Sequence, residues 1–552
     1  MLTPTFLLLS LLAQVFAHVT PYVRTNSQKV GDTKISWSTK CKALAGESAT
    51  PFKCANFSVP LDYTKPKSTK TLDLTLVRVD ATRKPVKGSV LFNPGGPGTS
   101  GLNFVLENAQ ELMTILGGHF NLIGFDPRGI NNTLPFQCYK DQYKVTSFGS
   151  SNASDVTLGQ QFAQAEIQAL QCQAATKDIG GLVGTAFVAR DMAQIVDALG
   201  EDGMLRYWGF SYGTVLGSTF SAMFPEKVDK VVLDGVANVH EYYAGLYNSD
   251  FLSLDDVVAG FYSGCFASRD CVLAKQAQNP DDLAQKVDAL LENLKYNPIP
   301  LYTKASPALI TYDTVKTAMW GAMSQPKTWP SWADGLNLLL AGNLTGFYEV
   351  LSAFSKPPDQ SLEALYGIEC GEQSLKVENL TDLAPEIAAL AASSVWGGFD
   401  FGLSNAIQCV RWKQKAKEIY SGDWTIQTKN PIMFIGNTYD PVTPMVSAKN
   451  VSASFQSSVF LQHNGYGHTS LAQPGLCSAR AVSAYFNEGV LPASDTICQH
   501  DDPLFSGETW QQALAPLSHN GTKASITKKD NEDALLLAAL GKVGQSVHSH
   551  RK

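Results

Sequence analysis

The sequence has no excess of basic residues, no closely spaced cysteine pairs of the metal-binding kind, and few charged residues for its length. Lysine and arginine number 43 against 50 aspartates and glutamates, a formal net charge of −7. This balance gives no general attraction to nucleic acid or to an anionic membrane. Hydrophobic residues make up 44% of the 552 and charged residues 17%, which excludes a disordered or fibrous chain. We therefore expect a globular protein of one large or two fused domains.

The first 17 residues, MLTPTFLLLSLLAQVFA, are apolar but too few to span a bilayer. Val15 and Ala17 occupy the small-residue positions of a cleavage site, so we expect a signal peptide cut after Ala17 and a secreted protein. The basic residues that usually open a signal peptide are missing. A buried N-terminal helix is the alternative, but no cap or amphipathic period supports it. No other segment predicts a membrane span, because the apolar stretch 534–540 is also too short.

Ten cysteines, an even number without CxxC spacing, favour disulfides in an oxidising compartment. Connectivity cannot be deduced from sequence, but sequence neighbours suggest five pairs: Cys41 with Cys54, Cys138 with Cys172, Cys265 with Cys271, Cys370 with Cys409, and Cys477 with Cys498. Seven glycosylation sequons are spread along the chain, at Asn56, Asn131, Asn152, Asn343, Asn379, Asn450 and Asn520. Together these features predict an exported glycoprotein.

Short apolar runs alternate with helical patterns along the first half of the chain. Residues 71–79 alternate apolar and polar side chains as an edge strand would, whereas 88–92 and 121–125 are short apolar runs typical of buried strands. Residues 204–210 and 228–233 are further strand candidates. Helical patterns lie between them, at 102–116 and 185–199 for example. The alternation predicts an α/β fold with a mostly parallel sheet flanked by helices.

A long helix-rich insertion separates these strands from two later ones at 431–435 and 458–462. Residues 281–294 and 380–392 have helical patterns, and strand-like runs are few from 238 to 398. The predicted organisation is a signal peptide at 1–17, a first core part at 18–237, a helical cap at 238–398, a second core part at 399–505 and a C-terminal extension at 506–552. The extension is polar and rich in Lys and Ser near its start.

A G-x-S-x-G motif, Gly209-Phe210-Ser211-Tyr212-Gly213, lies between a predicted strand and an apolar helical pattern at 214–224. This context suits a sharp turn in which the glycines allow close packing and the serine hydroxyl projects above the sheet. A G-x-S-x-G in a coil is more often a chance match. Here the strand and helix on either side favour Ser211 as a nucleophile.

A serine nucleophile in this arrangement needs an acid and a base on loops after later strands. Asp440 follows the strand-like PIMFIGNTY, and His468 ends the loop NGYGH after the strand-like SVFLQ. A loop-capping carboxylate is the alternative for Asp440. His463 competes for the role of base, but it directly follows its strand and precedes the glycine loop, so we prefer His468.

Acyl transfer also needs N–H groups directed at the developing oxyanion. We expect one from Tyr212, directly after the nucleophile, and one from Gly95 or Gly96 in the loop NPGGPG at 93–98. A plain Gly/Pro turn is the alternative. Arg128, in the motif DPRG at 126–129, is interpreted as a structural brace through Asp126 or a backbone carbonyl, with a direct substrate role as the alternative.

The motifs together resemble the tripeptidyl-aminopeptidase-like branch of the prolyl-aminopeptidase family of α/β-hydrolase serine exopeptidases. They are NPGGPGTSG (93–101), GFDPRG (124–129), GFSYG (209–213), VVLDGV (231–236), CVRW (409–412), GNTYDPVTP (436–444) and GYGHTS (465–470), in family order. Asn93 and Pro94 replace the histidine that precedes Gly-Gly-Pro-Gly in the prolyl branch, which favours the tripeptidyl-type relatives. The resemblance implies an α/β-hydrolase core interrupted by a helical cap.

The resemblance also implies release of short peptides or single residues from substrates with a free N-terminus. The substrate ammonium then needs a carboxylate in the cap, and Glu369 and Glu372, on either side of Cys370, are the candidates, with an exposed acidic pair as the alternative. No metal or organic cofactor is implied. Two other functions stay open: an esterase or lipase with the same triad, and a non-catalytic protein that binds a ligand in the cap groove.

Overall fold

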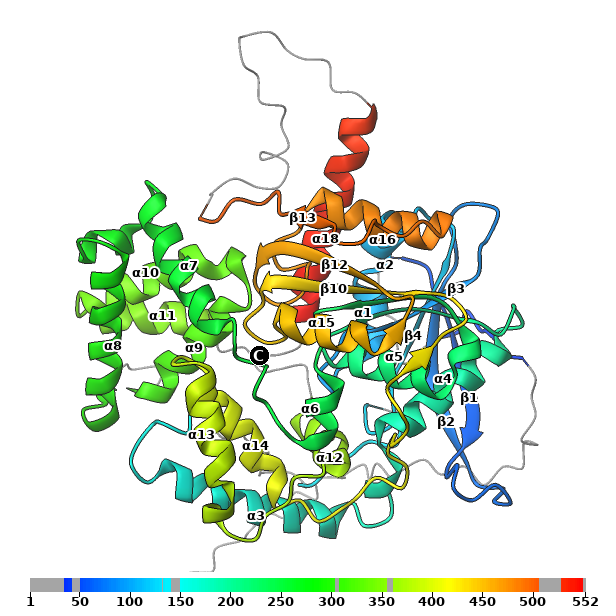
Figure 1. Ribbon diagram of the computed structural model, residues 1–552, viewed down its shortest axis with the longest axis horizontal. Coiled ribbons are helices and arrows are strands. Elements are labelled where there is room, and N and C mark those ends of the chain that lie inside the picture. The colour runs from blue at the N-terminus through cyan, green and yellow to red at the C-terminus, as the bar shows by residue number, and fades with distance from the viewer. Residues whose placement is uncertain are drawn as a thin grey trace, which may run out of the picture.

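The computed structural model describes residues 34–41, 50–131, 133–139, 149–302, 307–354, 361–505 and 528–549. The predicted signal peptide and the sequon at Asn520 lie outside these residues. A nine-stranded sheet in the order β1-β2-β4-β3-β5-β6-β10-β12-β13 organises the chain (Figure 1). The strands are β1 (Lys53–Pro60), β2 (Thr71–Val79), β3 (Ser89–Asn93), β4 (Asn121–Phe125), β5 (Leu205–Phe210), β6 (Val228–Asp234), β10 (Ile432–Tyr439), β12 (Val459–Tyr466) and β13 (Ile497–Gln499).

The sheet is mostly parallel, as expected for an α/β-hydrolase. Only β2 is antiparallel to its neighbours, β1 and β4. The prediction that β2 forms the edge was wrong, because β1 pairs along its full length and takes the edge position. Every residue of β3 and of β5 is buried, since helices cover both faces of the central strands and favour continuous apolar runs there.

Two layers of helices cover the sheet. Helices α4 (Thr185–Ala198), α5 (Tyr212–Met223) and α15 (Met445–Ala453) contribute to the hydrophobic cluster on one face. On the other face lie α1 (Gly101–Glu107), α2 (Ala109–Ile115), α16 (Leu476–Glu488) and the C-terminal α18 (Lys528–Ser549). Helix α18 buries Leu540, Val543 and Val547 against this second cluster. No helix among the described residues is long and apolar enough to cross a membrane.

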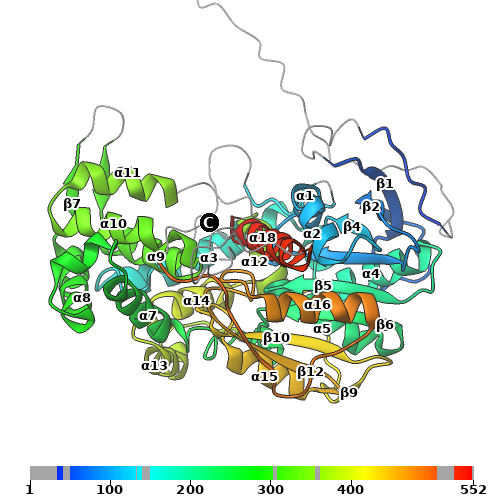
Figure 2. The same cartoon turned by 90° about the horizontal axis from the view of Figure 1, so that it is seen from above.

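A helical insertion between β6 and β10 forms the cap, which lies beside the sheet in both views (Figures 1 and 2). Its helices are α6 (Val239–Ala244), α7 (Leu254–Ala267), α8 (Pro280–Tyr296), α9 (Tyr312–Met323), α10 (Trp329–Leu340), α11 (Leu344–Phe354), α12 (Leu362–Glu372), α13 (Ala384–Ser393) and α14 (Leu403–Val410). Trp329, Trp332 and Phe261 are buried in a separate hydrophobic cluster of the cap. The cap therefore has a core of its own.

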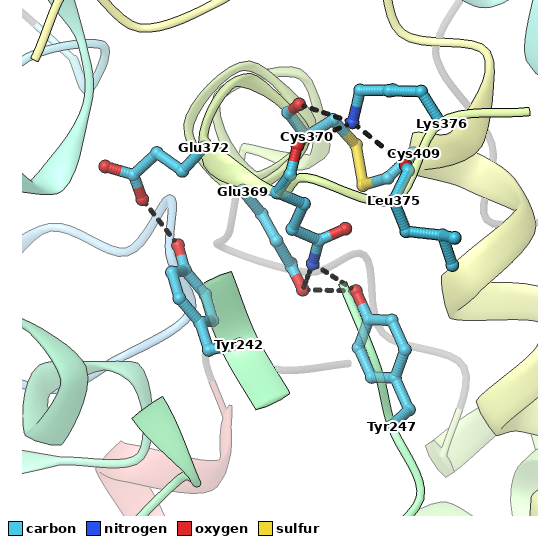
Figure 3. The surroundings of a disulfide bond; sticks show 9 residues. Tyr242, Tyr247, Glu369, Cys370, Glu372, Leu375, Lys376 and Cys409 are labelled. Atoms are coloured by element: carbon cyan, nitrogen blue, oxygen red, sulfur yellow. Dashed lines mark hydrogen bonds between the residues drawn. A yellow bond between two sulfur atoms is a disulfide. The ribbon is translucent and has the colours of Figure 1, made fainter. Parts of the chain in front are cut away.

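Five disulfides join the cysteines in the pairs suggested by the sequence. They link Cys41 with Cys54, Cys138 with Cys172, Cys265 with Cys271, Cys370 with Cys409, and Cys477 with Cys498. No cysteine is free. The bond between Cys370 and Cys409 ties α12 to α14, and Figure 3 shows it beside the acidic residues of α12.

Candidate active site

Ser211 lies in a strained turn between β5 and α5. Its backbone has φ 56° and ψ −124°, a conformation that non-glycine residues rarely adopt and that is typical of functional sites. The Ser211 N–H donates to the carbonyl oxygen of Asp234 at 3.2 Å, and the Ser211 carbonyl accepts from the Thr214 N–H at 2.8 Å. The turn is thereby held to β6 on one side and to the first turn of α5 on the other.

Glycines on both sides of this turn allow backbones to approach closely. A Cβ at Gly209 would lie 2.4 Å from the Gly213 carbonyl oxygen, and one at Gly213 would lie 2.5 Å from the Asn93 carbonyl oxygen. A Cβ at Gly95 would lie 2.8 Å from the Ser211 Cβ, and Gly95 also has φ +106°. The loop after β3 thus packs directly on the serine turn.

Asp440 and His468 meet at the carboxyl ends of the neighbouring parallel strands β10 and β12. The His468 Nδ1 lies 3.0 Å from each carboxylate oxygen of Asp440, and both side chains are fully buried. The His468 N–H donates to the Ser324 carbonyl oxygen of the cap at 3.0 Å. The cap therefore contributes to the placement of the histidine.

Asp440 is held as a carboxylate by several donors. The N–H groups of Val442, Thr443 and Thr469 donate to it at 2.8 to 2.9 Å, and the Thr443 hydroxyl donates at 2.9 Å. Burial alone would raise the pKa of Asp440, but His468 and these N–H groups outweigh burial and lower it below its ordinary value. An ionised Asp440 beside Nδ1 fixes the neutral imidazole with its proton on Nδ1, which leaves Nε2 to act as a base.

The competing histidine, His463, is fully buried inside the fold. Its ring nitrogens lie 2.8 Å from the Ser478 hydroxyl and 2.9 Å from the Gln473 carbonyl oxygen. Burial lowers the pKa of His463 to about 4. Both nitrogens are therefore occupied by structural contacts, in agreement with the preference for His468.

The two glycines proposed for the oxyanion hole have different surroundings. The Gly95 N–H donates to the side-chain oxygen of Asn93 at 2.9 Å. Gly96 lines the same cavity as Ser211 and Tyr212. The arrangement favours the N–H groups of Gly96 and Tyr212 as oxyanion donors and gives Gly95 a supporting position.

Asp234 is a further buried acid at the site, and the sequence singled it out only as part of VVLDGV. Its side chain accepts from the Ser470 N–H at 2.8 Å and from the Ser470 hydroxyl at 2.6 Å. Burial raises the pKa of Asp234 to about 7, although the Ser470 bonds oppose the change. Because the Asp234 carbonyl also binds the Ser211 N–H, this residue links the serine turn to the loop of His468.

A cavity of about 690 Å³ lies between the sheet and the cap, with Ser211 in its wall. Apolar and aromatic side chains make up more than half of the lining, and most of them come from the cap, among them Tyr242, Trp320, Phe354, Leu365 and Tyr366. Three carboxylates, Asp250, Asp313 and Glu369, also line it, and the described lining residues include no Lys, Arg or His. The cavity lining therefore combines apolar surface with negative charge.

The two glutamates proposed to bind a substrate ammonium differ in position. Glu369 lines the cavity, where its Oε1 accepts from the Tyr247 hydroxyl at 2.5 Å and from the Gln373 amide at 3.1 Å. Glu372 is fully buried on another side of α12 and accepts from the Tyr242 hydroxyl at 2.9 Å (Figure 3). Its side chain does not line the cavity, so only Glu369 stands where an ammonium could reach it.

Arg128 of the motif DPRG has the structural contacts with backbone carbonyls that were expected, and in addition an acidic partner outside the motif. Arg128 is fully buried and binds Asp191 through two bonds of 2.6 and 2.8 Å, and it also donates to the carbonyl oxygens of Pro60 and Leu61. Asp126 instead accepts from the Ser100 hydroxyl at 2.5 Å. Arg128 thus braces β1 against α4 through backbone carbonyls, as one of the two expected alternatives, and its acidic partner is Asp191.

The sequons lie mainly on the surface. Asn56, Asn131, Asn343, Asn379 and Asn450 are exposed, and Asn152 is half-buried with its amide 3.3 Å from the Tyr312 hydroxyl. Glycosylation of these residues stays a prediction. Among the described residues, no group of three or more His, Cys, Asp or Glu side chains is arranged to hold a metal ion.

Comparison with known proteins places this chain among hydrolases. The family model of the TAP-like protein matches residues 397–498, which include Asp440 and His468. Serine protease Hip1 of Mycobacterium tuberculosis is 27% identical over 475 residues, 81% of this chain and 87% of the relative. Tripeptidyl aminopeptidase of Streptomyces lividans is 34% identical over 194 residues, 34% of this chain and 36% of the relative. Carboxylesterase B of M. tuberculosis is 27% identical over 489 residues, 84% of this chain and 89% of the relative.

Proposed function

We propose that this α/β-hydrolase, which carries a TAP-like domain at residues 397–498, is a serine exopeptidase that removes short peptides from free N-termini. Serine protease Hip1 and tripeptidyl aminopeptidase, both relatives at modest identity, support a serine peptidase. Within that class, the charge of the cavity carries the proposal. Ser211 opens into a space with three carboxylates and, among the described lining residues, no cationic side chain.

In the proposed reaction, the Ser211 hydroxyl attacks the scissile carbonyl carbon while His468 Nε2 accepts its proton. The N–H groups of Tyr212 and Gly96 stabilise the negative charge that develops on the carbonyl oxygen. The imidazolium of His468, stabilised by Asp440 at 3.0 Å, then gives its proton to the departing amine. Water hydrolyses the acyl-enzyme with His468 as base, which releases the N-terminal fragment and restores Ser211.

Recognition of a free N-terminus is assigned to Glu369. An ammonium that leaves water for a mainly apolar cavity needs a carboxylate partner. Glu369 is already fixed by Tyr247 and Gln373, so little conformational freedom is lost when the substrate binds. Asp250 and Asp313 add to the negative charge of the same cavity.

The test compares one peptide offered with a free and with an N-acetylated terminus, and all products are identified by mass. Wild-type protein should release short N-terminal fragments from the free peptide alone, and Ser211→Ala should release none. Glu369→Gln should raise KM for the free peptide, because the amide cannot neutralise the ammonium. Equal cleavage of the free and acetylated forms would reject an exopeptidase that reads the N-terminus.

A second candidate function is a carboxylesterase, because carboxylesterase B is a relative over most of the chain and the same catalytic residues cleave esters. An esterase should hydrolyse neutral aryl esters at least as well as peptides and should not respond to Glu369→Gln. The same set of substrates and variants therefore separates the two functions.

Export and glycosylation complete the proposal. Five disulfides and no free cysteine are typical of proteins that fold in an oxidising compartment. Mass analysis of the mature protein would detect cleavage after Ala17 and sugars on the predicted asparagines.

A further inference from the structure

Glu372 lies at the end of α12 and receives three hydrogen bonds without a cation among its bonded partners. The Thr185 N–H donates to its Oε1, while the Thr185 hydroxyl, at 2.8 Å, and the Tyr242 hydroxyl, at 2.9 Å, donate to its Oε2. The carboxyl group is fully buried, and only 2% of the residue is exposed. A buried carboxyl with this many donors is part of a specific network and not a surface charge.

The network continues to the residue after the proposed nucleophile. The Tyr212 hydroxyl lies 2.6 Å from the Thr185 hydroxyl, and both are buried. When Glu372 is ionised, Thr185 gives its single hydroxyl proton to the carboxylate, so Tyr212 donates to Thr185. In that state the order of donation is Tyr212 to Thr185 to Glu372.

Helix α12 is connected to both sides of the proposed oxyanion hole. At its start, the Ser361 N–H donates to the Gly98 carbonyl oxygen of the loop after β3 at 3.1 Å. At its end, Glu372 reaches Tyr212 through Thr185. The loop that carries Gly96 and the turn that carries Tyr212 are thus tied to one rigid element of the cap.

We propose that Glu372 is a positioning residue that fixes Tyr212, and with it the oxyanion hole, from the cap helix α12. The inference rests on the proposed function in one respect, since it takes the Tyr212 N–H as an oxyanion donor. It assigns Glu372 no contact with substrate, and it separates the two acids of the GIECGE segment. Glu369 faces the cavity to bind the substrate, and Glu372 holds the catalytic backbone.

Glu372→Gln tests the role of the carboxylate at nearly constant volume. If the amide oxygen keeps the bond from the Thr185 N–H, the amide NH₂ faces the Thr185 and Tyr242 hydroxyls and donates to them. The Thr185 hydroxyl then turns its proton toward Tyr212, and the Tyr212 hydroxyl loses its acceptor. Tyr212→Phe removes only the last link and leaves Glu372 bonded to Thr185 and Tyr242. Glu363→Gln is the matched control, because Glu363 lies on the same helix and accepts from the Cys138 N–H at 2.8 Å, outside this network.

Two assays are run on each variant: the rate at which a fluorophosphonate labels Ser211, and the kcat and KM for a peptide with a free N-terminus. The fluorophosphonate reports the serine and the oxyanion hole without requiring a peptide. We expect Glu372→Gln and Tyr212→Phe each to lower labelling rate and kcat about tenfold, less than removal of an oxyanion donor, with KM within about twofold. The double variant should be no slower than the slower single variant.

Unchanged labelling and kcat in Tyr212→Phe would overturn the inference, whether or not Glu372→Gln folds. Losses that add up in the double variant, or an equal loss in Glu363→Gln, would also overturn it, because they would indicate general damage to α12. A different result would show that the proposed peptidase function is wrong: wild-type protein would react with the fluorophosphonate but leave free peptides intact. The labelling rates of the variants would still decide the role of Glu372.

Discussion

Glu372 makes the stability of the fold depend on pH in a direction that its replacement by glutamine should reveal. Burial raises the pKa of Glu372 from its ordinary value of 4.5 to about 7. Between these two values the folded protein holds a proton that the unfolded chain has released. The stability that this group contributes is therefore present below pH 4.5 and is lost as pH rises toward 7. Each pH unit within the interval removes ~1.4 kcal/mol, or about 3 kcal/mol in all.

The wild-type profile alone does not isolate this effect, because other buried groups titrate over the same range. Asp234, with its pKa raised to about 7 by burial, acts in the same direction. His463, with its pKa lowered to about 4 by burial, acts in the opposite direction, since folding becomes less favourable as pH falls below 6.5. The difference between wild type and Glu372→Gln cancels these contributions.

The assay is guanidinium unfolding of both proteins at pH 5 and pH 7.5, with disulfides intact and tryptophan fluorescence as the signal. On raising the pH, the wild type should lose about 2 kcal/mol more of its free energy of unfolding than the variant does. Parallel changes in the two proteins would refute the reasoning. They would mean that Glu372 keeps an ordinary pKa and that its three donors fully compensate for burial.

Two further predictions concern the catalytic loops. Asp440→Asn should lower kcat about 10⁴-fold, because the amide favours the wrong tautomer of His468, and KM should change little. Tryptophan fluorescence checks that the variant is folded, and a loss of kcat below tenfold would contradict the assigned role. Gly95→Ala should abolish labelling of Ser211, since its Cβ would lie 2.7 Å from the Phe210 carbonyl oxygen at a φ of +106°, whereas Gly159→Ala, with nothing within 4 Å, should leave labelling unchanged.

Much of the fold could be predicted because its strongest signals are local. The strands β3, β4, β5 and β6 each lie within a residue or so of the position that the sequence predicts. The carboxyl ends of parallel strands share one edge of a sheet, so Asp440 and His468 could be expected to meet from their sequence positions alone. The disulfides also followed sequence proximity.

The parts of the fold and the site that the sequence did not predict depend on contacts between segments far apart in the chain, and no local pattern indicates such contacts. The alternating pattern of β2 looks like an edge, but β1 pairs beside it. Glu369 and Glu372 are three residues apart on one helix, and their different surroundings depend on Tyr247 and Thr185, far away in the chain. The bond from Asp234 to Ser470 spans 236 residues, so its role in the site could not be found by motif alone.

Helix α18 has a consequence for how the protein is made. Lys542 pairs with Glu111 and the Asn108 amide donates to Ser546, across more than 400 residues of sequence. Leu540, Val543 and Val547 complete a hydrophobic cluster whose other members come mostly from the first half of the chain and from β10 to α16. During synthesis the N-terminal strands and helices therefore leave the ribosome with one face uncovered. That face is covered only after α18 itself has been synthesised, so the nascent chain exposes part of this apolar cluster until then.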